Sequence, residues 1–377
     1  MKKNLLVCRS GGRTSEYMYK YILENHSDEY NIVGIFANTG WEHHKTLEFV
    51  NNNDIENEKL YGVKPIWVEA VVHKGRVACT HKLVTYETAS RDREPFVEVV
   101  KKYGLPNSAY PHCTRELKEA PIHDYIKNVM GWSNKKGEIP DPHCDCSLCF
   151  IEPKPYFTAL GIRSDEPVRV MGSENIAILK KSSPLTIKNN ADAMDFRALV
   201  RESDKITGWE LISLHFEKLS LIDNSWPSIK KMKSMYDKFI GLDTPQNKVY
   251  PLVDWHPDKP DKLDIIDWWE ERDFDLGIPE HLGNCVGCFR KSERKSMKAY
   301  RDAPEQFVNT MEKDYGHIGS NKIKGVHVDE PRTMYRNYKT CDDIITMFNE
   351  VDKGWLNKDD PDYMNEGCAS SCEPFAG

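Results

Sequence analysis

Long apolar runs, internal repeats and low-complexity stretches are absent from this sequence of 377 residues. No segment reaches the roughly 18 consecutive apolar residues that a membrane-spanning helix needs. The first residues, MKKNLL, lack the long apolar core of a secretory signal, so we expect a cytoplasmic protein with no membrane partner. The formal net charge of −7 argues against wholesale nucleic-acid wrapping but leaves room for a local basic groove.

The first glycine pair belongs to neither of two common nucleotide motifs. It lacks the Gly-Lys-Ser/Thr of a P-loop, and it does not form G-x-G-x-x-G. Between a predicted strand, Leu5–Cys8, and a predicted helix, Thr14–Glu24, the chain instead reads SGGRTS. Backbone N–H groups of such a loop can converge on an anion at the positive end of the helix. The candidate phosphate-binding residues are Ser10, Gly11, Gly12, Arg13, Thr14 and Ser15.

Strand and helix patterns alternate after this loop. A second strand is predicted at Asn31–Gly40, a helix at 44–53 and a third strand at 63–72. This order predicts an α/β fold with a mostly parallel, doubly wound sheet. We place a nucleotide-binding domain at residues 1–300, with helical and Cys-rich insertions near 131–155 and 175–245, and a C-terminal extension of unknown role at 301–377.

Five further segments decide what the loop resembles: FANTGWEHHKTLEFV, HCTRELKEAP, GIRSDEPVR, VYPLVDW and GNCVGCF. With SGGRTS, they occur in the order seen in the phosphoadenylylsulfate (PAPS) reductase-like branch of the adenine nucleotide α-hydrolase superfamily, also called the PP-loop superfamily. The Cys113 segment is also similar to that of the DNA phosphorothioation sulfurtransferase. Thr14 stands where many members have Asp, and the tail reads GCASSCEPFAG instead of Glu-Cys-Gly-Leu-His. The resemblance therefore concerns the fold and the nucleotide site.

The resemblance implies a bound adenine nucleotide, ATP or a PAPS-like molecule, with Asn38, Thr39 and Gly40 near its base or ribose. Gly161 belongs to the GIRSDEPVR segment, where Arg163 follows a predicted strand and could clamp phosphate or sulfate with two prongs. Asp165 and Glu166 would orient Arg163 or hold Mg²⁺; a surface ion-pair cluster is the alternative. We expect Arg115 and Lys118, one helical turn apart, to face the same pocket as further anion contacts.

Eleven cysteines are many for a protein of a reducing compartment, where such residues more often serve metals or redox chemistry than disulfides. Cys285 and Cys288 form a Cys-x2-Cys pair, and the resemblance adds Cys113 as a third ligand of a [4Fe–4S] cluster. A second set could supply a fourth thiolate or hold a separate Zn²⁺, completed by Cys368 and Cys372. That set is His143, Cys144, Cys146 and Cys149.

Three functions remain open from the sequence. The first is nucleotide-dependent sulfur transfer or sulfonucleotide chemistry with a Cys-bound metal centre, in which Arg163, Asp165, Glu166 and Cys113 are the catalytic candidates. The second is an ATP α-phosphate hydrolase or adenylating enzyme with structural zinc. The third is a non-catalytic module that binds an adenine nucleotide. The sulfur donor or acceptor, a small molecule or a nucleic acid, and the oligomeric state are not specified by any motif.

Overall fold

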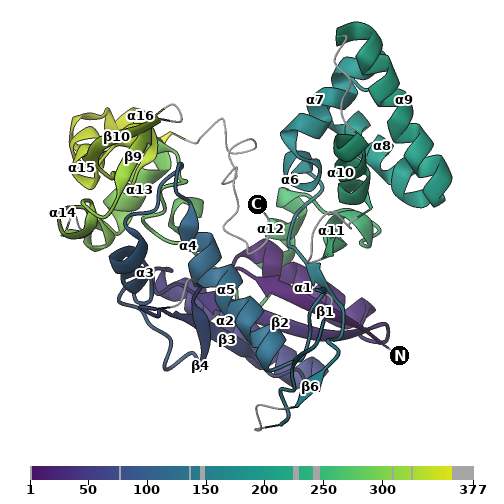
Figure 1. Ribbon diagram of the computed structural model, residues 1–377. Helices are drawn as coiled ribbons and strands as arrows, with labels where there is room; N and C mark the ends of the chain where they lie inside the picture. The colour runs from purple at the N-terminus through teal and green to yellow at the C-terminus, as the bar shows by residue number, and fades with distance from the viewer. Residues whose placement is uncertain are drawn as a thin grey trace. The chain divides into compact units, whose positions relative to one another are not determined.

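A computed structural model describes residues 2–75, 78–135, 137–144, 149–223, 229–240, 247–307, 310–323 and 326–358. The strands of its main sheet are β1 (Lys3–Arg9), β2 (Tyr30–Asn38), β3 (Ile66–Val71), β4 (Thr80–Val84), β7 (Tyr156–Ala159) and β8 (Lys248–Val249). They lie in the order β4-β3-β2-β1-β7-β8, of which Figure 1 labels β1 to β4. The pairs β2–β3, β1–β7 and β7–β8 are parallel, and β3–β4 is antiparallel. The predicted α/β class with a mainly parallel sheet is confirmed.

The chain divides into two compact units, each built from separated segments. Unit 1 contains residues 1–8, 17–33 and 131–272, and unit 2 contains residues 9–16, 34–130 and 273–377. The sequence-based boundary at residue 300 falls within the last segment of unit 2. Each unit is described by itself below.

Unit 1 combines β1, β7 and β8 with a set of helices. Two of the helices, α8 (Asn190–Glu202) and α12 (Lys262–Glu270), begin with a capping box. In α8 the side chains of Asn189 and Asp192, and in α12 those of Asp261 and Asp264, satisfy backbone N–H groups at the start of the helix. The other elements are α1 (Arg13–Asn25), which begins in unit 2, β5 (Ile139–Pro140), β6 (Phe150–Ile151), α6 (Pro167–Met171), α7 (Ser173–Ser182), α9 (Lys205–Asp223), α10 (Ile229–Phe239) and α11 (Pro251–Asp254).

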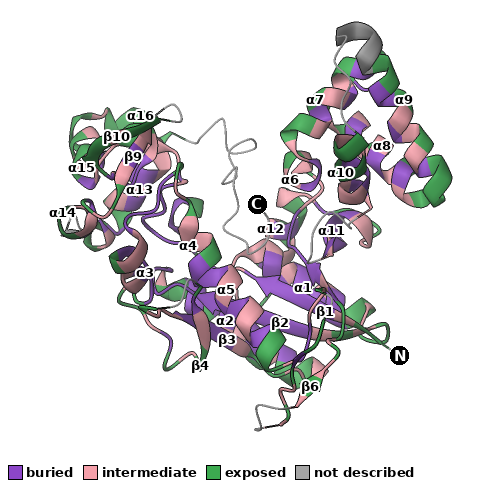
Figure 2. Ribbon diagram, viewed as in Figure 1, coloured by how far each residue is buried: buried purple, intermediate pink, exposed green. Residues whose placement is uncertain are grey.

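Unit 2 packs α2 (His44–Tyr61) against strands β2 and β3. Phe36, Leu47, Val50 and Trp67 are buried together there, and α2 ends at Gly62, whose φ of 67° suits glycine. Figure 2 shows strand β2 as largely buried. The other helices and strands are α3 (Phe96–Tyr103), α4 (His112–Thr114), α5 (Ala120–Asn128), α13 (Glu293–Asp302), α14 (Thr310–Tyr315), β9 (Ser320–Ile323), β10 (Val326–Pro331), α15 (Cys341–Glu350) and α16 (Lys353–Asn357).

The sequence patterns locate most of these elements but not all of them. The first two strands and the first two helices lie where the alternation predicts them, although α2 is longer than expected. The antiparallel strand β4 and the helix α3 were not predicted. Residues 175–245, expected to be an insertion of short helical patterns, contain the helices α7 to α10 in their described part. Among the described helices, none is both long and apolar enough to cross a membrane.

Candidate functional site

The two glycines of the loop between β1 and α1 have different roles. Gly11 has a φ of 76°, and a Cβ there would lie 2.8 Å from the methyl carbon of Thr46, so the fold requires glycine. A Cβ on Gly12 would have Ser10 Oγ as its nearest neighbour, at an ordinary 3.6 Å. Gly12 is thus not needed for packing, and it leaves its backbone accessible to a ligand.

The serine hydroxyls hold the loop closed on itself. Ser10 donates both its N–H and its Oγ–H to Ser15 Oγ, over 3.1 and 3.0 Å, and Ser15 Oγ donates to the carbonyl of Gly12 over 3.0 Å. Ser15 is fully buried. Helix α1 begins at Arg13, so its positive N-terminal end adjoins Thr14 and the loop. A glycine loop at the positive end of a helix is a common place for an anion to bind, and in this loop the N–H of Ser10 already bonds to Ser15.

A buried charge network joins the two ends of the loop, and sequence reasoning missed it. Arg9, directly before the loop, bonds to Glu16, directly after it, through Nη2 at 2.7 Å and Nε at 3.0 Å. Arg9 Nη1 also bonds to Asp54 Oδ1 at 2.5 Å, and the other oxygen of Asp54 accepts from the indole of Trp67. All three charged side chains are buried. The network fixes the spacing of the loop ends.

Arg13, a candidate anion contact, has an acidic partner in unit 2. Its guanidinium makes a two-pronged bond to Asp275, with distances of 2.6 and 2.5 Å. Burial raises the pKa of Asp275, but the hydrogen bond and charge of Arg13, together with hydrogen bonds from the backbone of Leu276 and Gly277, outweigh it, and the net shift of the pKa is downward. The pair therefore stays ionised at neutral pH and ties the start of α1 to the last segment of unit 2.

The turn after β2 is built mainly for its own rigidity. Asn38 Nδ2 donates to the buried Glu69, and Asn38 Oδ1 accepts from the N–H of Gly40. Gly40 has a φ of 77°, and a Cβ there would overlap the carbonyl oxygen of Glu94. Thr39 Oγ1 donates to Glu42 and lies 3.3 Å from the sulfur of Cys285. The turn thus connects the end of β2 to the Cys-x2-Cys loop.

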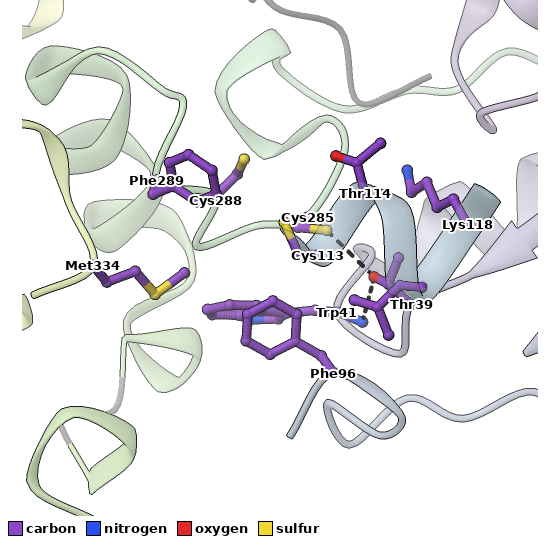
Figure 3. A pocket seen from close by; sticks show the side chains of 11 residues that line it. Thr39, Trp41, Phe96, Cys113, Thr114, Lys118, Cys285, Cys288, Phe289 and Met334 are labelled. Atoms are coloured by element: carbon purple, nitrogen blue, oxygen red, sulfur yellow. Dashed lines mark hydrogen bonds between the residues drawn. The ribbon is translucent and has the colours of Figure 1, made fainter. Parts of the chain in front are cut away.

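Three of the predicted ligand cysteines line one small cavity of about 20 Å³, within unit 2 (Figure 3). They are Cys113, Cys285 and Cys288, and Thr39, Trp41 and Lys118 line the same cavity. The Cys-x2-Cys loop reaches it because Gly287 has no side chain: a Cβ there would lie 2.3 Å from the ring of Trp41. The N–H of Val286 also bonds to the carbonyl of Trp41.

The helical segment that carries Cys113 is irregular. α4 continues into a π-helical turn, Arg115–Glu119, a feature frequent at functional sites. Lys118 is buried and lines the cavity, whereas Arg115 does not line it: its side chain is 59 % exposed and bonds to Glu116. The wider turn changes the regular helical spacing, and of the two residues only Lys118 lines the thiol cavity. That Arg115 and Lys118 both contact an anion in a nucleotide pocket stays a prediction.

The thiols of Cys113, Cys285 and Cys288 are suitable metal ligands by their chemistry, but they are not arranged around a metal site. Among the described residues, no group of three or more His, Cys, Asp or Glu side chains is gathered closely enough to hold a metal ion. In Figure 3 the sulfur of Cys288 is drawn apart from those of Cys113 and Cys285. Elsewhere in unit 2, burial raises the pKa of Cys79 and of Cys341 to about 12, so both stay protonated and are poor ligands.

The second cysteine set lies in unit 1. Cys144 and Cys149 are partly buried and His143 is exposed. Cys146 and the tail cysteines Cys368 and Cys372 lie outside the described residues. These positions therefore stay predictions as zinc ligands.

Arg163, also in unit 1, is held by the carboxylates that flank it. Its Nε and Nη2 bond to the two oxygens of Asp165 at 2.8 and 3.1 Å, and Glu166 accepts from its backbone N–H. Burial lowers the pKa of Arg163, but the bond to Asp165 and the charge of Glu166 raise it further, so the net shift is upward. Gly161 is buried two residues before it. Arg163 and Asp165 thus form an ion pair, which both an orienting role of the carboxylates and a surface ion-pair cluster predict.

Comparison with known proteins gives little beyond this geometry. No protein-family model matches the chain. No solved structure matches it either. The chain is 25 % identical to the uncharacterized nin region protein ORF290 of Escherichia phage lambda, over 99 % of this chain and 95 % of that protein. This similarity runs along nearly the whole of both chains and assigns no activity.

Several residues of the site were not predicted. Glu42, Glu69 and Trp41 shape the turn after β2 and the thiol cavity. Trp41 and Glu42 directly follow Asn38–Gly40 in the quoted motif, so their position was a usable signal. Nothing local in the sequence marks Glu69, because its partners come from other segments.

Proposed function

We propose that this protein is an enzyme of the PAPS reductase-like kind that binds an adenine nucleotide at Ser10–Ser15 and carries out sulfur chemistry at the thiol cavity. The observation that carries the proposal is that Cys113, far in sequence from Cys285 and Cys288, lines the same cavity as these two cysteines and Thr39. Thr39 follows the carboxyl end of β2, and α/β sheets bind their ligands at that edge.

The glycine loop supports the nucleotide half of the proposal. It follows the carboxyl end of β1, offers backbone N–H groups at a helix start, and is locked by Ser10, Ser15 and the Arg9 network. A preformed loop loses less conformational entropy on binding a phosphate than a flexible one. Lys118 at the thiol cavity adds a cationic group for an anionic substrate.

The metal centre is part of the proposal. Thiolates are the usual ligands of iron–sulfur clusters and of structural zinc, so the donor types of the cavity fit both. Cys113, Cys285 and Cys288 would hold the metal once their three sulfurs come closer together. A cluster with one open iron would give a sulfur substrate a place to bind.

Nucleotide binding is tested with Gly12→Val. The new side chain has room in the free protein, so the variant should fold, while its branched carbons should obstruct the approach of a phosphate. We expect titration calorimetry with ATP and with PAPS to show at least a tenfold loss of affinity for the nucleotide that binds. Gly75→Val is the matched control, because Gly75 also has open space around it. Unchanged affinity in Gly12→Val would remove the loop from the nucleotide site.

The metal is tested by counting iron, sulfide and zinc in protein purified without oxygen. We expect Cys113→Ala, Cys285→Ala and Cys288→Ala each to lose the metal, and Cys79→Ala, whose thiol is protonated, to keep it. If Cys113→Ala keeps its full metal content while Cys146→Ala and Cys149→Ala lose theirs, the proposed ligand set is wrong. Release of AMP and pyrophosphate from ATP by a zinc-only protein would favour the adenylating alternative.

A further inference from the structure

Unit 1 contains a second, larger cavity of about 290 Å³. Its size is at the lower end of the range for small-molecule sites. The walls come from α1, from the turn after α11 and from α12. They include Tyr17, Tyr21, Glu24, His256, Asp258 and Trp268, and Lys20 also lines the cavity.

Aromatic rings form a corner in this cavity. The rings of Tyr17 and Trp268 are nearly perpendicular, at 84°, with centroids 4.9 Å apart, and His256 lies 4.5 Å from Tyr21. Trp268 already accepts one cation, since the guanidinium carbon of Arg272 lies 3.8 Å from the centroid of its ring. Rings at such angles can surround a cation with the negative faces of their π systems.

Hydrogen bonds fix the protonation of these rings. His256 Nδ1 accepts from the backbone N–H of Asp258 at 3.2 Å, so its proton is on Nε2, which donates to Tyr17 Oη at 2.9 Å. Burial lowers the pKa of His256 and raises the pKa of Tyr17. Both rings are therefore neutral at pH 7, and the hydroxyl of Tyr21 donates to the carbonyl of Trp255.

Two carboxylates and one ammonium group, that of the buried Lys20, line the cavity. Glu24 and Asp258 line it, and both are exposed at its edge. After burial, the charges of Asp258 and Asp264 are the largest causes that raise the pKa of Tyr17, followed by Tyr21 and Glu24. The negative potential of the carboxylates therefore reaches the phenol oxygen. A weakly hydrated cation at the exposed edge of the cavity would be attracted both by the rings and by these carboxylates.

We propose that the aromatic corner formed by Tyr17, Tyr21, His256 and Trp268, with Glu24 and Asp258 at its edge, binds a small alkylated ammonium ion. The rings contact the alkyl groups around the positive charge, and the carboxylates balance that charge without needing N–H donors from the ligand. The site is independent of the proposed nucleotide chemistry.

Choline chloride is the probe, and 3,3-dimethylbutan-1-ol, its uncharged isostere of nearly equal shape, is the matched ligand. We expect calorimetry or ligand-observed NMR to show that choline binds the full-length protein at least tenfold more tightly than the alcohol. Trp268→Ala should abolish choline binding, and Asp258→Asn, a change at the exposed edge, should weaken it several-fold. Asp267→Asn on α12, whose carboxylate does not line the cavity, is the control and should bind as the wild type does.

The proposal is overturned if wild-type protein does not bind choline, or if the alcohol binds equally well, because either result excludes recognition of the charge. It is also overturned if Asp258→Asn and Asp267→Asn behave alike. Asp258→Asn keeps the test decisive should Trp268→Ala fail to fold.

Discussion

Replacing Arg9 by Met tests the buried network under the glycine loop. Met keeps much of the side-chain volume and removes the bonds from the guanidinium to Glu16 and Asp54. Arg9 is 1 % exposed, Glu16 is 0 % and Asp54 is 5 %, so water cannot easily replace the lost cation. Removing one partner of such a buried pair costs about 3–5 kcal/mol, because the remaining charges stay buried.

That loss is a large part of the total stability of a domain, which is about 5–15 kcal/mol. Urea titration followed by circular dichroism measures it as a shift of the unfolding midpoint. Lys101→Met is the control, because the pair of Lys101 with Glu98 is 46 % exposed on both sides and contributes about 0.3–0.5 kcal/mol at most.

The reasoning fails if Arg9→Met loses less than about 1 kcal/mol, the range of an exposed pair. In that case water or a neighbouring group compensates for the guanidinium, and the network does not hold the loop. A large loss in Lys101→Met as well would show that the assay reports lost charge in general.

Three further predictions concern other parts of the chain. Gly40→Ala should destabilise unit 2 strongly in urea titration, since its Cβ would overlap the Glu94 carbonyl; wild-type stability would show that the turn can rearrange. Arg163→Lys should weaken nucleotide binding at least tenfold in calorimetry if Arg163 binds an anion, because Lys cannot form a bidentate contact. Equal affinities would mean that Arg163 forms only an ion pair with Asp165 and does not bind the nucleotide. Burial lowers the pKa of His215 to about 4, so the unfolded chain takes up the proton first and stability falls as the pH drops from 6.5 toward 4. The urea midpoint of His215→Gln should fall less over this range, and an identical fall would contradict the assignment.

The sequence by itself determined the local elements around the site. An apolar run, a glycine pair and an amphipathic pattern were enough to place β1, the loop and α1, because each depends on neighbouring residues. The second strand and its polar turn followed from the same rule. The resemblance in the ordered motifs also grouped Cys113 with Cys285 and Cys288, which line one cavity in the structure.

Only the tertiary structure decided which side chains meet. Regular helical spacing predicted neither that Lys118 lines the thiol cavity nor that the exposed side chain of Arg115 pairs with Glu116. Arg13 was predicted as a phosphate contact, and the sequence did not indicate its partner Asp275, from a distant segment of the chain. Periodicity reports contacts within a few residues, whereas these pairings arise from the packing of segments far apart in sequence. The residues next to a carboxylate in the sequence do not indicate which cationic side chain will pair with it in the folded protein.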